Sequence, residues 1–193
     1  IHRFSLPGIL DTLKNTLDTD KEPIHHYMEK YGMVPPWILF KSIYFSTIVN
    51  YIDLLKTPEQ AKIVHQIYNL DDQLSEEAQI KLMMDTLFVA LEYRNIAAHG
   101  GRIYNYQCKR EIPAASFRAD SSGKGFAQLL QPLRFLNYTA PVTYLDSVLN
   151  REINRHCQKF PNDITYLGQI FNVNITAHNL VWVSQKSKIY HST

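Results

Sequence analysis

The sequence EEAQIKLMMDTLFVALEYRNIAAHGG, residues 76–101, contains the most informative helical pattern in the chain. Apolar side chains recur in it at steps of three and four residues, which is the pattern of one face of an α-helix. They are Ile80, Met84, Leu87 and Leu91. Ser75 and the acidic residues after it are typical of a helix N-terminus, because carboxylates there face the positive end of the helix dipole. Gly100 and Gly101 predict the end of this helix near Ala98.

The flanking sequence predicts more helices. Their expected ranges are 10–17, about 23–31, 37–55, 57–70, 126–136 and 141–160. Gly32 is expected to terminate the second, and Thr57 with Gln60 forms a capping box that opens the fourth. Residues 107–124 read as a long loop, and Val181–Val183 as a short strand or docking segment in a mixed tail. The sequence therefore predicts an all-α fold, a bundle of short antiparallel helices.

Length and composition limit the alternatives. The 193 residues fit a single domain over 1–193, and Ile1 in place of methionine predicts that an N-terminal segment is missing. A net charge of +2 does not by itself indicate a nucleic-acid binder, so an RNA-binding hypothesis must rest on a local site. Two cysteines without CxxC spacing, and no secretory signal, predict a cytoplasmic location. The longest apolar candidate, 37–55, contains too many polar residues to span a bilayer.

The apolar face of the long helix turns polar in its last turns. At about 100° per residue and with Leu91 at zero, Asn95 falls near +40°, His99 near +80° and Arg94 near −60°. Burying such groups unpaired costs several kcal/mol, so they must be paired or face a cleft or partner. The alternative is a satisfied polar patch that pins helices together.

These residue types suit the cleavage of RNA. Histidine can transfer protons near neutral pH, and the arginine fork fits a phosphate. Without a carboxylate cluster, the set suits attack by the internal 2′-hydroxyl, with proton transfer at the attacking and leaving oxygens and no metal. A second Arg-x4-His copy, Arg151 to His156, has the acidic Glu152 after the arginine and is interpreted as a charged outer helix face.

The longer string RNIAAHGGRIYN, residues 94–105, resembles the RN-x-x-AH-x-x-R-x-x-N signature of the Abi-like (abortive infection) branch of the HEPN superfamily. HYMEKYG at 26–32 and PPWIL at 35–39 resemble two further segments of that family. The resemblance covers residues 20–106. It implies a HEPN-like helical bundle and a metal-independent ribonuclease whose arginine and histidine meet across a homodimer.

Carried over residue by residue, the resemblance makes Arg94 and His99 the catalytic pair. Asn95 becomes the polar companion of the arginine, and Arg102 and Asn105 become supporting or RNA-contacting residues. Gly100–Gly101 stands where the family often has a histidine or another polar residue, so a second histidine is absent from the motif. Because acid and base roles need two titrating groups, we expect a two-fold dimer that brings His99 of both chains to one interface.

Lys109 and Arg110, with Arg118 and Lys124, could form a phosphate-contacting arm; the alternative is an ordinary solvated loop. The histidines lack ligand spacing, so neither a metal nor another cofactor is expected. The predicted function is an abortive-infection endoribonuclease toxin. Its expected partners are RNA and a second copy, with an antitoxin as a further candidate and no membrane. The alternative is a non-cutting HEPN-like module that binds RNA, a nucleotide or a partner protein.

Overall fold

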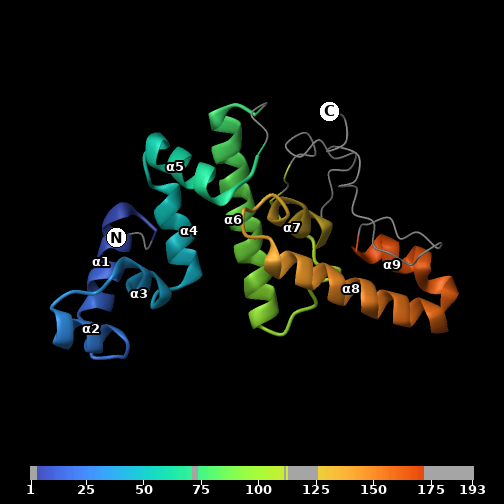
Figure 1. Ribbon diagram of the computed structural model, residues 1–193, viewed down its shortest axis with the longest axis horizontal. Helices are drawn as coiled ribbons and strands as arrows, with labels where there is room; N and C mark the ends of the chain where they lie inside the picture. The colour runs from blue at the N-terminus through green and yellow to red at the C-terminus, as the bar shows by residue number, and fades with distance from the viewer. Residues whose placement is uncertain (1–3, 71–73, 111, 113–125, 172–193) are drawn as a thin grey trace. The chain divides into compact units, whose positions relative to one another are not determined.

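The computed structural model describes residues 4–70, 74–110, 112 and 126–171, and helices follow one another through that part of the chain (Figure 1). The residue contacts divide the chain into two compact units, Ile1–Gln60 and Ala61–Thr193. Within the described residues the β-structure is limited to one isolated antiparallel bridge between Tyr68 and Leu136. The all-α prediction is therefore confirmed. The single domain over 1–193 stays a prediction.

The first unit contains the helices α1 (Leu6–Leu17), α2 (Ile24–Tyr31), α3 (Pro36–Lys41) and α4 (Phe45–Asp53). Helix α1 begins four residues before the predicted start, because the Ser5 hydroxyl accepts a hydrogen bond from the Gly8 N–H at 3.4 Å. Helix α2 ends as predicted at Gly32, whose φ of +67° is open to glycine at little steric cost. Ile9, Ile24 and Val49 are buried.

The single helix predicted over 37–55 is wrong, since the chain forms α3 and α4 with a break at residues 42–44. The Ser42 hydroxyl donates to the Ile38 carbonyl, and the Ser42 N–H bonds to Leu39, three residues back. Such local bonds compete with continuation of the helix. Tyr44 is extended and becomes the N-cap of α4.

The predicted capping box before α5 (Thr57–Ile67) does not form. Thr57 already lies inside the helix, and the Gln60 amide instead donates to the Ile52 carbonyl at 2.9 Å and to the Asp53 carbonyl at 3.4 Å. Carbonyls in the last turn of a helix lack partners within it. Gln60 thus satisfies the end of α4 rather than the start of α5.

The second unit contains α6 (Glu76–Ala98), α7 (Phe126–Leu133), α8 (Ala140–Lys159), the 3-10 turn η2 (Pro161–Asp163) and α9 (Ile164–Phe171). Both predicted helices at 126–136 and 141–160 are present. The turn η2 and helix α9 were not predicted. The buried core of this unit is shared by α6, α7, α8 and the segment after α6. Its members are Leu82, Val89, Tyr93, Cys108, Ile112, Phe126, Leu130, Ile153 and Cys157.

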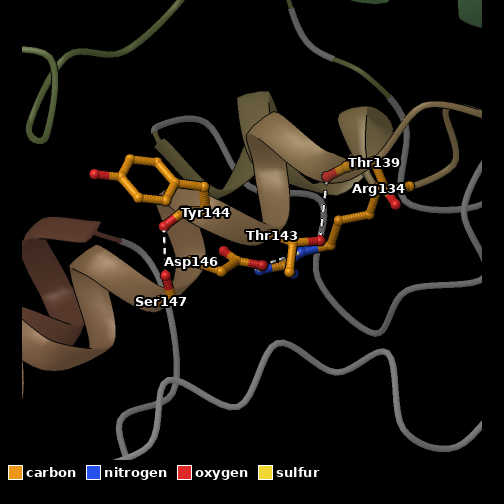
Figure 2. Close-up of polar contacts among 6 residues, drawn as sticks. All are labelled: Arg134, Thr139, Thr143, Tyr144, Asp146 and Ser147. Carbon is orange, nitrogen blue, oxygen red and sulfur yellow. Dashed lines mark hydrogen bonds and ion pairs between the residues drawn. The ribbon is translucent and has the colours of Figure 1, made fainter.

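An ion pair joins the end of α7 to α8 (Figure 2). Arg134 follows α7, and its Nη2 and Nε donate to the two oxygens of Asp146 at 2.7 and 3.1 Å. The Arg134 side chain is 8% exposed, so its charge depends on this bidentate partner. The predicted loop at 107–124 falls mostly outside the described residues, and the predicted strand Val181–Val183 falls entirely outside them.

Candidate functional site

The candidate site lies at the C-terminus of α6, and the conformation of that terminus determines its geometry. Gly100 adopts a φ of +71°, its N–H bonds to the Ala97 carbonyl at 3.1 Å, and the Gly101 N–H bonds to the Ile96 carbonyl at 2.8 Å. These are the two hydrogen bonds of a Schellman motif, with His99 as the C-cap residue. The predicted end of the helix is confirmed.

Each of the two glycines meets a different requirement. Gly100 is in the left-handed region, where a side chain is strained. A Cβ on Gly101 would lie 2.6 Å from Ile96 Cγ2 and 3.0 Å from the Ile96 carbonyl oxygen. The chain therefore turns sharply against α6 directly after His99, and the two glycines determine where Arg102 emerges.

The face of α6 that joins the core is not the predicted one. Leu82, Val89 and Tyr93 belong to the core cluster. The predicted face lies about 180° away around the helix axis. It consists of Met84, which is buried, and of Ile80, Leu87 and Leu91, which are partly buried. Apolar side chains lie on more than one face of α6, so a three-and-four periodicity does not select a single face.

Because the core packs against Leu82, Val89 and Tyr93, the polar end of α6 lies on the side away from the core cluster. Arg94, Asn95 and His99 are all exposed, as are Arg102 and Asn105 in the segment that follows. The hypothesis that these groups form a satisfied patch between helices therefore has no support in the described residues. Exposed groups in this arrangement can contact a ligand or a second protein.

The side chains of Arg94 and Asn95 are joined by a hydrogen bond. Arg94 Nη1 donates to Asn95 Oδ1 at 3.1 Å, which orients the guanidinium and leaves its other N–H groups available. Among the described residues no side-chain hydrogen bond joins Arg94 to His99. Five residues along a helix correspond to a rotation of about 140°, so the two side chains leave α6 in different directions.

The arginines of the motif differ from the others that the structure describes. Arg110 pairs with Asp85, Arg134 with Asp146, and both Arg151 and Arg155 with Glu152. Within the described part of the chain, Arg94 and Arg102 have no carboxylate partner. Their charge is available to an anion from outside the chain.

The segment after the motif is held to α6 by two tyrosines. The Tyr93 hydroxyl donates to the Tyr106 carbonyl at 2.9 Å, and the Tyr106 hydroxyl donates to the Glu92 carboxylate. Glu92 Oε1 also accepts from the Lys109 N–H at 3.1 Å. Glu92 therefore holds the Tyr106 side chain and the Lys109 backbone, on either side of Cys108 and just beyond Arg102 and Asn105. The sequence analysis missed this carboxylate, although an acidic residue in an apolar helix was a signal for it.

These contacts alter the ionisation of the buried groups. The hydrogen bond to Glu92 raises the pKa of Tyr106 from 10.0 to about 12. Burial raises the pKa of the Cys108 thiol from 9.0 to about 12, and the charge of Glu92 adds to this effect. Burial also raises the pKa of Tyr93 above its ordinary value. Cys108 is thus a protonated, inert core residue and not a nucleophile.

The two described cations of the predicted arm lie in different environments. Lys109 is exposed. Arg110 Nη1 bonds to Asp85 Oδ1 at 2.7 Å, and its guanidinium lies 4.3 Å from the centre of the Phe88 ring. Asp85 is buried and also pairs with Lys81, so Arg110 stabilises a buried charge on α6. Arg118 and Lys124 lie outside the described residues, and RNA contact by any of the four stays a prediction.

Within the described residues, His, Cys, Asp and Glu side chains do not gather in a group of three or more that could hold a metal ion. A helix with the length and apolar character needed to cross a membrane is likewise not found in the described part of the chain.

Comparison with known families places the chain. Residues 3–105, which include the Arg-Asn-x3-His motif at the end of α6, match the family model described as "Abi-like protein". The chain belongs to the Abi-like protein family. Membership indicates a function related to abortive infection. Searches of curated proteins and of solved structures gave no match.

Proposed function

We propose that this Abi-like protein is a metal-independent endoribonuclease of the HEPN type, with Arg94 and His99 as its catalytic residues. The observation that carries the proposal is the contrast among the described arginines, because the two within the family motif lack a carboxylate partner. A guanidinium without a carboxylate partner can hold a scissile phosphate, and an exposed imidazole can transfer protons at it.

The reaction is an internal transesterification. An imidazole removes the proton from the ribose 2′-hydroxyl, and the 2′-oxygen forms a bond to phosphorus. The bond from phosphorus to the 5′-oxygen breaks, and a second imidazole, in its protonated form, donates its proton to that leaving oxygen. The products are a 2′,3′-cyclic phosphate and a 5′-hydroxyl. Arg94 stabilises the charge that develops on the phosphorus oxygens, and Asn95 holds its guanidinium in place.

The geometry of α6 favours a site shared between two chains. A single chain supplies one histidine in the motif, and the reaction uses two. Arg94 and His99 also leave α6 about 140° apart, which works against both reaching one phosphate from the same helix. A two-fold dimer can place His99 of each copy beside the guanidinium of the other. Arg102 and Asn105 would contact RNA next to the scissile bond.

One observation favours a second candidate, a module that binds RNA without cutting it. Within the described chain Arg94 and His99 do not contact each other, and exposed arginines hold phosphates whether or not a bond breaks. A binding module predicts that RNA is retained intact by the wild-type protein and that the loss of Arg94 weakens retention.

The test is cleavage of mixed RNA by purified protein in EDTA. Arg94→Ala and His99→Ala should each reduce the rate at least about 100-fold, the lower range for losing a proton-transfer or charge-stabilising group. Lys62→Ala and His65→Ala, at exposed positions on α5, are the matched controls and should keep the wild-type rate. Intact RNA with the wild-type protein would contradict the enzyme, and retention of that RNA would support the binding module.

The dimer is tested separately by sedimentation of the active protein at assay concentrations. We expect a homodimer and a specific activity that falls on dilution through its dissociation constant. An active, strictly monomeric protein would contradict the shared site while leaving the ribonuclease proposal in place. An antitoxin partner is a further candidate that co-purification from the native host would test.

A further inference from the structure

The outer face of α8 carries a hollow that is separate from the motif at the end of α6, because no residue of the motif lines it. Its volume is about 350 Å³, and it is lined by Glu152, Arg155, His156, Lys159 and Phe160. Phe160, the C-cap residue of α8, is 54% exposed. A large apolar ring left in solvent beside cations contributes little to the core of its own chain. It is, however, a suitable surface for a partner with a flat ring.

The aromatic side of this hollow is fixed by a chain of contacts. His156 Nε2 lies 2.8 Å from Asp163 Oδ2, and because an ionised carboxylate only accepts, the nitrogen is the donor. The His156 ring lies 5.0 Å from the Phe160 ring, centre to centre. The 3-10 turn η2, which contains Asp163, packs against α8. The Phe160 ring therefore packs against an oriented imidazole.

The charge of this face is positive. Glu152 accepts from Arg151 at 3.0 Å and from Arg155 at 3.2 Å, so one carboxylate is shared between two guanidinium groups. Lys159 has no ion-pair partner within the described residues. The sequence predicted a charged outer helix face here, and in the structure the charge of Glu152 is offset by the flanking arginines.

The cations of this face, and one tyrosine, follow one another along α8. Arg151, Arg155 and Lys159 follow at steps of four residues, about 6 Å of rise each, on the exposed face of α8. Tyr144, which Figure 2 shows near the start of the helix, falls within about 20° of Arg151 on the same face and is 72% exposed. Cations in a row with aromatic rings beside them are how proteins hold single-stranded nucleic acid.

We propose that the α8 hollow binds one nucleotide of single-stranded RNA, with the base stacked on Phe160 and the adjoining phosphates held by Arg155 and Lys159. The volume lies within the range of about 300–1,000 Å³ that is typical of ligand pockets. The site lies beyond residue 105, outside the segment matched by the family model. The role of the α8 hollow rests on the proposed function: it would bind the substrate RNA at a position distant from the bond that is cut. Binding itself is measurable without cleavage.

The experiment measures binding of a fluorescent single-stranded RNA oligonucleotide by anisotropy, in full-length protein carrying His99→Ala to prevent cutting. Adding Phe160→Ala should weaken binding about tenfold, the effect of removing one stacking partner. Adding Arg155→Ala with Lys159→Ala should reduce the slope of log affinity against log salt by about 0.7 for each phosphate that is no longer neutralised. Adding Lys56→Ala with Lys62→Ala, both at exposed positions, should change neither quantity.

Thermal melting verifies that each variant is folded, and Phe160→Leu, which keeps an apolar group but removes the ring, should weaken binding as Phe160→Ala does. Unchanged affinity and salt slope in the α8 variants would overturn the inference, as would full competition by double-stranded RNA or no measurable RNA binding. Wild-type cleavage with unchanged binding by the α8 variants overturns this inference alone. Binding that depends on α8 without wild-type cleavage overturns the proposed function alone.

Discussion

The Tyr106 phenol donates a hydrogen bond to the Glu92 carboxylate, and this bond ties the segment after the family motif to the helix that carries the motif. Glu92 precedes Arg94 by two residues, and Tyr106 follows Asn105 directly. One hydrogen bond therefore connects the two ends of the motif. Removing this hydrogen bond should lower the free energy of unfolding, which can be measured without an activity assay.

Tyr106→Phe should destabilise the protein by about 1–2 kcal/mol, because a hydrogen bond to a charged group is removed from a half-buried position. The measurement is urea unfolding followed by circular dichroism. Tyr104→Phe is the matched control, since the Tyr104 ring packs on Phe171 and its hydroxyl has no bond to a described residue. Equal stability of the two variants would show that the bond to Glu92 contributes nothing.

Stability should fall as the pH rises above about 9. The pKa of Cys108 is raised from 9.0 to about 12, so above pH 9 the unfolded thiol ionises while the folded thiol stays protonated. Tyr106 adds to the loss between pH 10 and about 12. Each raised group costs up to about 1.4 kcal/mol for each pH unit within its window. The check is urea unfolding at pH 8, 9 and 10, and Cys108→Ala should reduce the decline between pH 9 and 10 without abolishing it, because burial also raises the pKa of the Cys157 thiol.

Arg134→Leu should destabilise the protein by about 3 kcal/mol, because it leaves the partly buried Asp146 carboxylate without its bidentate partner (Figure 2). Arg134→Lys should recover little of this, since an ammonium cannot make the two-pronged contact. The control is Arg151→Leu, whose pair with Glu152 is exposed and should contribute less than about 1 kcal/mol. Similar melting temperatures for the two leucine variants would contradict the importance of burial here.

The two glycines after His99 should respond differently to substitution. Gly100→Ala should cost about 1–2 kcal/mol through strain at positive φ, and Gly100→Asn should cost less. Gly101→Ala must displace Ile96 and so shift the turn after His99. If this turn positions the proposed site, Gly101→Ala should lower the rate of RNA cleavage. The decrease should exceed the one expected from the fraction of protein that its loss of stability unfolds. Proportional losses of activity and stability would mean that the turn only stabilises the fold.

The features that sequence predicted well are local ones. The Ser75 cap accepts from the Ala78 N–H at 3.3 Å, and Gly32 and Gly100 end their helices at positive φ. In each case one residue and its near neighbours decide the conformation. The break at 42–44 was missed because it depends on the Ser42 hydroxyl choosing the Ile38 carbonyl, and a serine is tolerated inside many helices.

The candidate site was predicted in composition but not in arrangement. The exposure of Arg94 and His99 could not be read from periodicity, because α6 offers apolar side chains on several faces and only the packing of α7 and α8 selects one. The pairing of Arg110 with Asp85 joins residues 25 positions apart, and no spacing rule predicts it. The role of Glu92 likewise depends on a segment that folds back onto the helix.

If Arg94 and His99 cut RNA through its own 2′-hydroxyl, as proposed, cleavage must depend on that hydroxyl. The test uses a synthetic RNA whose cut site has been mapped, incubated with wild-type protein in EDTA, beside the same strand with a single 2′-deoxyribose at that site. We expect cleavage of the first strand to a 2′,3′-cyclic phosphate and no cleavage at the deoxy position of the second. Equal cutting of both strands, or no cutting of either, would contradict the proposal.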